Sequence, residues 1–350
     1  MEKFLISVLC PAYNHEKFIE RMINSVINQS YENWELIIVD DCSSDNTFQI
    51  ASMYANERIK VYKNESNLGV NYTLKKALNY SSGTVLMSLA SDDELINDAL
   101  EKIFEIYSKK NNTQATCCNL RVIDEYSKYR NDYENSALPL LQHKNKIELL
   151  RDSFFLENVL YNPGATFRRY VLEDILNECF ANITYQDYVL NIKLLIKYNL
   201  EIVDDYLVNY RILTTSLSNS GQLSKQMNIL EDFSVLNNFL LIKDVDLLKK
   251  IFAPEIKLYN ISPHKDFIPF FLGMMAIKSP HYSRKIWGYQ MVCNFYNKDA
   301  TAVFNTYGFE FKTLYNLARE LVTPYIKKEK KQKFYKQLLK RILGLAKKIR

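Results

Sequence analysis

The first 125 residues alternate short apolar runs with segments in which apolar residues recur every three or four positions. The apolar runs span 4–10, 34–39, 59–62, 85–89 and 115–122. The intervening segments predict helices over 16–27, 47–54, 72–79 and 99–107. Continuous apolar runs of this length are typical of strands buried on both faces of a parallel sheet. Because strands and helices alternate, we expect right-handed βαβ units, and hence an α/β fold with a mostly parallel sheet flanked by helices.

The pattern changes along the rest of the chain. It weakens between 125 and 160, returns as mixed strand and helix between 161 and 215, and is mostly helical from Leu223 onward. A polar cluster over 216–221 contains one glycine and indicates a boundary near 220. We therefore predict a first domain over 1–220, a helical region over 221–325 and a basic amphipathic helix over 326–350.

Acidic residues follow two of the predicted strands. Asp40 and Asp41 come after the second strand, Asp92 and Asp93 come after the fourth, and the first strand ends in Pro-Ala-Tyr-Asn at 11–14. Ligands of open α/β sheets bind beyond the carboxyl ends of the strands. Carboxylates at that edge can hold Mg²⁺ or Mn²⁺, and the cation can hold a phosphate. Taken singly, each acid pair is better explained by turn or helix-capping chemistry.

The net charge of +5 hides an asymmetry. Residues 325–350 contain eleven Lys or Arg and one acid, a net charge of +10, so the remainder carries −5. Within the tail, Phe334, Leu338, Ile342 and Ala346 recur every four residues. A basic amphipathic helix suits an anionic membrane surface; a packed terminal helix with a solvated lysine face explains the pattern equally well. The acidic body and the lack of a reading motif argue against nucleic acid as a partner.

The sequence argues against several other classes of protein, including membrane-spanning proteins, secreted proteins and enzymes with nucleotide-binding glycine loops or a nucleophilic serine. No run of 18 apolar residues exists, and the N-terminus lacks the features of a signal peptide. The six cysteines form no C-x-x-C pair, which favours reduced thiols in a cytoplasmic protein. The four histidines lack metal-ligand spacing, and G-x-G-x-x-G, Walker and G-x-S-x-G sequences are missing. We expect a cytoplasmic protein whose tail can lie on the inner face of the cell membrane.

In combination, the strand-end motifs resemble those of the family 2 glycosyltransferases. The motifs are Pro-Ala-Tyr-Asn at 11–14, Val-Asp-Asp-Cys-Ser-Ser-Asp-Asn-Thr at 39–47, Asn-Leu-Gly at 67–69 and the segment ending in Ser-Asp-Asp-Glu at 91–94. The resemblance covers residues 3–125 well and continues weakly to about 220. It implies an inverting enzyme of the GT-A fold, of the type that builds bacterial surface glycans, with nucleotide-sugar binding and catalysis in 1–220.

The resemblance also implies roles for individual residues. Tyr13 and Asp41 would hold the nucleotide base, and Pro11 and Ala12 would line that wall. Asp92 would contact the ribose or the metal. In the same way, Asp93 would be the ligand of Mn²⁺ or Mg²⁺.

A candidate catalytic base lies further along the chain. Asp187, in the segment 183–190, takes the place of the family's base, and Gln186 replaces the usual Glu. An acid in the first turn of a helix is the alternative reading, because the helix dipole favours it there. Two further departures are Ser91, where many relatives carry Asp, and Leu213, where some carry a His metal ligand. They leave the third protein ligand of the metal in doubt.

The implied reaction transfers a sugar from a nucleotide-diphosphate donor, a UDP-sugar, to a glycan or lipid-linked glycan acceptor with inversion. The helical region 221–325 would select the acceptor. A nucleotidyltransferase is one alternative, although the basic glycine-rich phosphate loop expected near its first strand is missing. A non-catalytic glycan-binding protein that retains the fold is the other, kept open by the departures at positions 91, 186 and 213.

Overall fold

The computed structural model describes residues 3–110, 112–130, 145–156, 158–177, 186–213 and 222–329, with only the backbone over 222–230 and 322–329. The chain divides into two compact units, Met1–Leu241 and Ile242–Arg350. The boundary predicted near 220 falls outside the described residues. Helix α9, which follows it, belongs to the first unit, where the ring of Phe239 packs edge-on against Phe154 at 4.9 Å between centroids.

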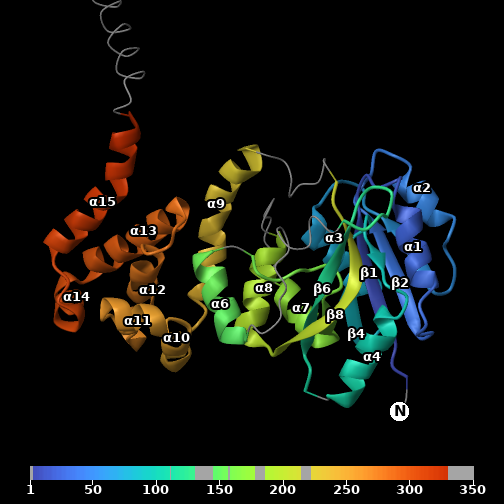
Figure 1. Cartoon of the computed structure of the whole chain (residues 1–350), viewed down its shortest axis with the longest axis horizontal. Helices are drawn as coiled ribbons and strands as arrows, with labels where there is room; N and C mark the ends of the chain where they lie inside the picture. The colour runs from blue at the N-terminus through green and yellow to red at the C-terminus, as the bar shows by residue number, and fades with distance from the viewer. Residues whose placement is uncertain are drawn as a thin grey trace, which may run out of the picture. The chain divides into compact units, whose positions relative to one another are not determined.

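The first unit is built on one mixed sheet (Figure 1). Among the described residues its strand order is β3-β2-β1-β4-β7-β6-β8-β5. The strands are β1 (Ile6–Ala12), β2 (Trp34–Asp40), β3 (Ile59–Lys63), β4 (Val85–Ser88), β5 (Glu94–Leu95), β6 (Ala115–Ile123), β7 (Thr166–Arg168) and β8 (Leu200–Arg211). Strands β1, β2, β3 and β4 pair in parallel, as do β6 and β8, whereas β7 and β5 join antiparallel. The five predicted strands and the mostly parallel α/β class are therefore confirmed.

Helices cover both faces of this sheet (Figure 1). They are α1 (Ile19–Ile27), α2 (Thr47–Ser52), α3 (Val70–Tyr80), α4 (Ala99–Lys109), α7 (Arg169–Asn177) and α8 (Gln186–Lys197), and α6 (Lys146–Phe155) and α9 (Gln222–Phe239) pack against α8. Side chains alternate along a strand, so Val8 and Cys10 of β1 pack in the core cluster with α1 and α4. Leu9 packs in the other cluster, with α3, α7 and α8. Burial of both faces explains why these strands are mostly apolar.

The ends of three strands meet at one edge of the sheet. Ala12 at the end of β1 pairs with Asp40 at the end of β2. The next residue, Asp41, donates its main-chain N–H to the carbonyl oxygen of Ala12 at 2.8 Å. Strand β4 runs parallel to β1 on its other side, and Leu89 donates its N–H to the carbonyl oxygen of Leu9. The motifs that follow β1, β2 and β4 are thereby brought to the same edge.

The second unit is helical over its described residues, as predicted for the region after 221. Its helices are α10 (Val245–Ile251), α11 (Ala253–Tyr259), η2 (Lys265–Phe267), α12 (Ile268–Ala276), α13 (Tyr282–Lys298), α14 (Ala300–Tyr307) and α15 (Phe311–Glu329). Helices α12 and α13 approach closely at two glycines: a Cβ on Gly273 would lie 2.8 Å from the carbonyl oxygen of Gly288. Of the predicted tail helix, 330–350 lies outside the described residues. Among the described helices, none is both long and apolar enough to cross a bilayer.

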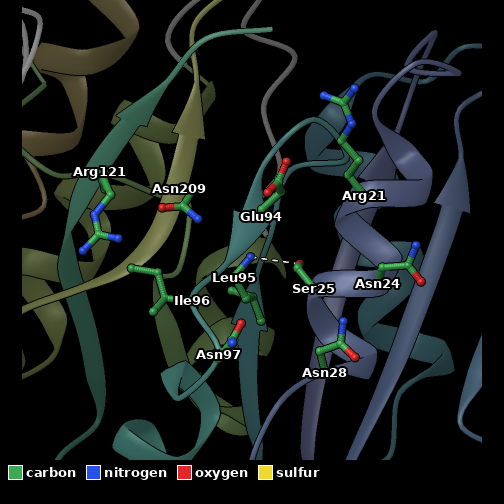
Figure 2. Close-up of a pocket in the computed structure, with 10 residues that line it drawn as sticks. All are labelled: Arg21, Asn24, Ser25, Asn28, Glu94, Leu95, Ile96, Asn97, Arg121 and Asn209. Carbon is green, nitrogen blue, oxygen red and sulfur yellow. Dashed lines mark hydrogen bonds between the residues drawn. The ribbon is translucent and has the colours of Figure 1, made fainter. Parts of the chain in front are cut away.

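The first unit also contains a cavity of about 540 Å³ on the α1 side of the sheet (Figure 2). It is lined by side chains of α1, by the segment Glu94–Asn97, and by one residue each from β6 and β8. Because α3, α7 and α8 cover the opposite face, this cavity and the start of α8 lie on different sides of the sheet.

Candidate functional site

Asp41 fixes the loop that leads into α3. It is buried, and one of its carboxylate oxygens, Oδ1, accepts hydrogen bonds from Asn64 Nδ2 at 2.7 Å and from the N–H of Leu68 at 2.9 Å. The other oxygen, Oδ2, accepts the N–H of Gly69 at 2.8 Å. Gly69 has φ +83°, a left-handed conformation that favours glycine. The carboxylate therefore sets both the end of β2 and the start of α3.

The loop after β1 presents an aromatic ring. Tyr13 is 45% exposed, and its neighbour Asn14 has φ +54°. The N–H of Asn14 donates to Ser43 Oγ at 2.9 Å, which ties this loop to the one after β2. Ala12 is buried at the end of the strand, and Pro11 is half-buried beside it. Of the four residues expected to meet the nucleotide base, Pro11 and Ala12 thus end β1, and Tyr13 and Asp41 lie in the two adjoining loops that follow β1 and β2.

The two acids after β4 have different surroundings. Asp93 is 1% exposed; its Oδ1 accepts the main-chain N–H of Arg211 at 2.8 Å, and its Oδ2 is buried with no hydrogen-bond partner among the described residues. Asp92 is half-buried, and its Oδ1 lies 3.8 Å from Nδ1 of His15. Burial and the neighbouring charge of Asp92 raise the pKa of Asp93 well above its usual value. A cation or a proton would satisfy the unpaired Oδ2.

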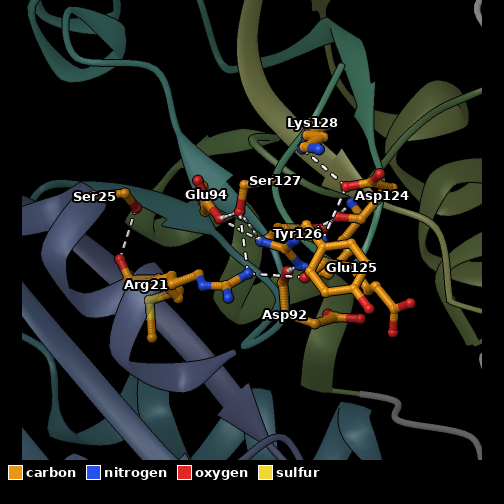
Figure 3. A network of polar contacts seen from close by, with 12 residues as sticks. Arg21, Ser25, Asp92, Glu94, Asp124, Glu125, Tyr126, Ser127 and Lys128 are labelled. Carbon is orange, nitrogen blue, oxygen red and sulfur yellow. Dashed lines mark hydrogen bonds and ion pairs between the residues drawn. The ribbon is translucent and has the colours of Figure 1, made fainter. Parts of the chain in front are cut away.

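Arg211, at the end of β8, binds the same segment through its side chain. The guanidinium donates to the carbonyl oxygen of Asp92 at 2.8 Å, to that of Asp124 at 2.6 Å and to the Glu94 carboxylate. Glu94 also accepts from Ser127 Oγ at 2.6 Å. Figure 3 shows Asp92, Glu94, Asp124 and Ser127 gathered in this network. Sequence reasoning assigned no role to Arg211 or Glu94, although Glu94 ends the Ser-Asp-Asp-Glu motif and Arg211 lies two residues before Leu213 in a family-like Tyr-Arg segment.

Ser91, in the place of a family Asp, contacts a histidine. His15 Nδ1 lies 2.7 Å from Ser91 Oγ, and Ser91 is buried. Among the described residues, no group of three or more His, Cys, Asp or Glu side chains is arranged to hold a metal ion. The adjacent carboxylates of Asp92 and Asp93, with the unpaired Oδ2, nevertheless fit a hard cation that takes its other ligands from a diphosphate and water.

Asp187 lies in the first turn of α8. Its Oδ2 accepts a hydrogen bond from Asn158 Nδ2 at 2.9 Å, and Asn191 Nδ2 in turn donates to Asn158 Oδ1 at 3.1 Å. Burial raises the pKa of Asp187 to about 6, although hydrogen bonds from the N–H of Tyr188 and from Asn158 act in the opposite direction. A carboxylate with this pKa is mostly ionised at neutral pH and can serve as a general base. No motif or spacing in the sequence pointed to Asn158 as a partner of Asp187.

A chain of contacts connects Asp187 with the strand-end edge. Asp41 binds the N–H of Gly69, the residue before α3. Two residues later, Asn71 Nδ2 donates to the carbonyl oxygen of Gln186 at 3.4 Å, and Gln186 precedes Asp187. The start of α3 therefore lies between the end of β2 and the start of α8. The structure brings the predicted base-binding acid and the predicted catalytic acid to the same side of the first unit.

Comparison with known proteins gives matches over this first unit. Residues 7–176 match the family described as "Glycosyl transferase family 2". The chain is 30% identical over 239 residues to the Escherichia coli UDP-Glc:alpha-D-GlcNAc-diphosphoundecaprenol beta-1,3-glucosyltransferase WfgD, covering 67% of this chain and 88% of that protein. It is 42% identical over 110 residues to the putative teichuronic acid biosynthesis glycosyltransferase TuaG of Bacillus subtilis, covering 31% of this chain and 44% of that one.

Solved structures agree in fold. S. aureus TarS in complex with UDP-GlcNAc matches with a TM-score of 0.53 at 18% identity, covering 84% of this chain and 91% of that one. The mannosyltransferase PcManGT of Pyrobaculum calidifontis, solved with GDP-Man and Mn²⁺, matches with a TM-score of 0.51 at 15% identity, covering 92% and 88%. Together with the match over most of the E. coli relative, these findings assign the family: the chain belongs to the family 2 glycosyltransferases.

Proposed function

We propose that this glycosyltransferase moves a sugar from a UDP-linked donor to a glycan or lipid-linked glycan acceptor, with inversion at the anomeric carbon. Transfer from a nucleotide-sugar donor follows from the family. The choice of UDP and of a lipid-linked acceptor is supported by the E. coli relative, whose name includes UDP-Glc and a diphosphoundecaprenol acceptor. The complex of TarS with UDP-GlcNAc supports the same nucleotide.

The donor would bind across the edge where β1, β2 and β4 end. Tyr13 covers the base with its exposed ring, Asp41 bonds the base, and Pro11 and Ala12 line the wall beside them. The Asp41 oxygens already accept three hydrogen bonds, and each carboxylate oxygen can accept more than one. Asp92, the more exposed of the two strand-end acids, contacts the ribose or the metal.

Mn²⁺ or Mg²⁺ would be held by Asp93, through its unpaired Oδ2, and by the diphosphate. When bound, such a cation offsets negative charge on the departing diphosphate. The protein's own contribution is the position of the acid pair. Arg211 fixes it through its main-chain N–H on Asp93 and its guanidinium on the carbonyl oxygen of Asp92.

Asp187 acts as the base in a single displacement. Its carboxylate removes the proton of the acceptor hydroxyl as that oxygen attacks the anomeric carbon. The bond from the anomeric carbon to the diphosphate oxygen breaks on the opposite side, so an α-linked donor gives a β-linked product. The observation that carries this role is the half-buried Asp187 carboxylate, held by Asn158 at 2.9 Å, with its pKa raised to about 6.

A screen of nucleotide sugars by thermal shift, with and without Mn²⁺, tests the donor. UDP-sugars should raise the melting temperature in the presence of Mn²⁺, since a ligand that binds only the folded state stabilises it. A shift with GDP- or CMP-sugars alone would reject the UDP assignment. Slow release of UDP without any acceptor separates an enzyme from a non-catalytic glycan-binding protein.

The basic tail would place the enzyme on the inner face of the membrane, near a lipid-linked acceptor. This part of the proposal rests on the sequence of 325–350, with its net charge of +10. Attraction to anionic lipid decays over a Debye length of roughly 8 Å at physiological salt. Co-sedimentation with anionic liposomes should therefore be salt-sensitive and should disappear when residues 330–350 are deleted. Equal sedimentation of the full-length and shortened proteins would reject the anchor.

A further inference from the structure

Most of the residues that line the cavity on the α1 side of the sheet are polar or charged, and Leu95 and Ile96 complete the lining. Arg21, Asn24, Ser25 and Asn28 come from α1, and Arg121 and Asn209 come from β6 and β8 (Figure 2). Its volume of about 540 Å³ falls in the range of small-molecule sites, roughly 300–1,000 Å³. A cavity of this composition cannot be explained as a gap in apolar packing.

Several of these groups have hydrogen-bonding capacity to spare. Oδ1 of Asn209 is buried and has no hydrogen-bond partner among the described residues. The Arg121 guanidinium lies over the rings of Tyr129 and Tyr206, 5.9 and 5.7 Å from their centroids, and forms no hydrogen bond with any described residue. A buried unpaired amide oxygen is costly, so a donor supplied by a ligand would stabilise this site.

The charge of the cavity is positive. Its one carboxylate, that of Glu94, is already bound by the guanidinium of Arg211, which is 0% exposed. One guanidinium nitrogen of Arg21 donates a hydrogen bond to the carbonyl oxygen of Glu125 at 2.8 Å. No carboxylate among the described residues lies within ion-pair distance of Arg121. An anionic ligand is therefore favoured.

We propose that this cavity binds an anionic saccharide, that is, a sugar carrying a carboxylate or a phosphate. A side-chain amide offers a donor and an acceptor together, which matches the donor and acceptor of a sugar hydroxyl, and Asn28, Asn97 and Asn209 supply three such amides. The planar guanidinium of Arg121 binds a carboxylate or phosphate through two parallel hydrogen bonds. The aromatic rings on either side of Arg121 hold it in place.

This site is separate from the donor and acceptor positions proposed above. The cavity lies on the α1 face, whereas Asp187 begins a helix that packs on the α3 face. Two cavity residues also contact the network around the acid pair: Glu94 binds the Arg211 guanidinium, and Arg21 donates to Ser127 Oγ, which also accepts from Arg211. Binding here does not depend on sugar transfer, so either proposal can fail while the other stands.

Isothermal titration of the full-length protein, saturated with UDP and Mn²⁺, tests the proposal. The probes are glucuronate, glucose 6-phosphate, glucose and inorganic phosphate, at equal ionic strength. Saturable binding of glucuronate or glucose 6-phosphate is expected, at least tenfold tighter than that of glucose or inorganic phosphate. Whichever acid binds identifies the anionic group. Absence of saturable binding by both acids would overturn the proposal, as would binding that is seen only when UDP is left out.

Variants locate the binding. Arg121→Gln and Asn209→Ala should each weaken the affinity for the acidic sugar at least tenfold, and the exposed Arg121 can be replaced without disturbing the core. Lys109→Gln is the matched control, because it removes an exposed positive charge on α4 that does not line the cavity. Asp187→Asn should leave the affinity unchanged. Unchanged affinity in Arg121→Gln, or an equal loss in Lys109→Gln, would contradict the assignment.

Discussion

The main-chain N–H of Arg211 donates a hydrogen bond to Oδ1 of Asp93 across 2.8 Å, although the two residues are 118 positions apart in the sequence. Asp93 follows β4 and Arg211 is the last residue of β8. The contact therefore joins the predicted metal-binding acid to the far part of the sheet. The Arg211 guanidinium strengthens the connection through Asp92, Glu94 and Asp124.

Arg211→Met should destabilise the first unit strongly. The guanidinium is buried, and its removal takes one hydrogen-bond donor each from the Glu94 carboxylate and from the carbonyl oxygens of Asp92 and Asp124. Breaking a buried pair by removing one partner typically costs about 3–5 kcal/mol. Urea denaturation at pH 7 measures the loss. Lys109→Gln, in an exposed pair with Glu105, is the control and should leave the midpoint almost unchanged; an Arg211 variant as stable as this control would show that the network has no structural role.

Asp93→Asn should weaken metal-dependent nucleotide binding while the fold is retained. The amide keeps an oxygen for the Arg211 N–H but is a poor ligand for a hard cation. We expect UDP affinity in the presence of Mn²⁺ to fall at least tenfold, and UDP affinity without metal to stay the same. Calorimetry with and without Mn²⁺ separates the two. If Asp92→Asn alone produces this loss and Asp93→Asn does not, then Asp92 holds the metal.

Asp187→Asn should be less active and more stable than the parent protein. Loss of a general base lowers turnover by roughly a hundredfold or more. The pKa of about 6 in the folded state lies above the ordinary value of 3.8 for an aspartate. The stability linked to this group is therefore present below pH 3.8 and is lost as the pH rises through 6. At pH 7 the parent therefore bears a cost of about 2–3 kcal/mol that the variant avoids. Turnover at pH 7 tests the predicted loss of activity, and urea denaturation at pH 7 tests the predicted gain in stability. A fully active variant would mean that Asp187 is only an acid in the first turn of a helix and not the base.

Asn158→Ala should move the pH dependence of the reaction. The Asn158 Nδ2 hydrogen bond favours the charged form of Asp187, so its removal raises the pKa of the base further. The base works only when ionised, and kcat/KM of the parent should rise with pH up to a plateau above about 6. In the variant this rise should occur at higher pH, so activity at pH 6 falls more than at pH 8. An equal loss at both values would mean that Asn158 acts on packing alone.

Much of the fold could be predicted because its central strands are buried on both faces. Val8 and Leu9 pack on opposite sides of the sheet, so the run containing them is apolar apart from Ser7, whose hydroxyl donates to Glu35. Strands β5 and β7 have two and three residues, too few to produce a pattern. The position of Asp41 and Asp93 at strand ends was visible in the sequence. The residues that donate hydrogen bonds to these carboxylates, such as Gly69 and Arg211, could not be predicted from the sequence, because those contacts depend on tertiary structure.

The most direct test of the proposed mechanism is the configuration of the sugar released when water replaces the acceptor. Proton NMR should follow hydrolysis of the α-linked UDP-sugar selected by thermal shift, in the presence of Mn²⁺. A single displacement predicts that the β-anomer appears first, before mutarotation, and that Asp187→Asn forms it roughly a hundredfold more slowly. Initial release of the α-anomer, or no release of UDP from any α-linked UDP-sugar, would contradict the account.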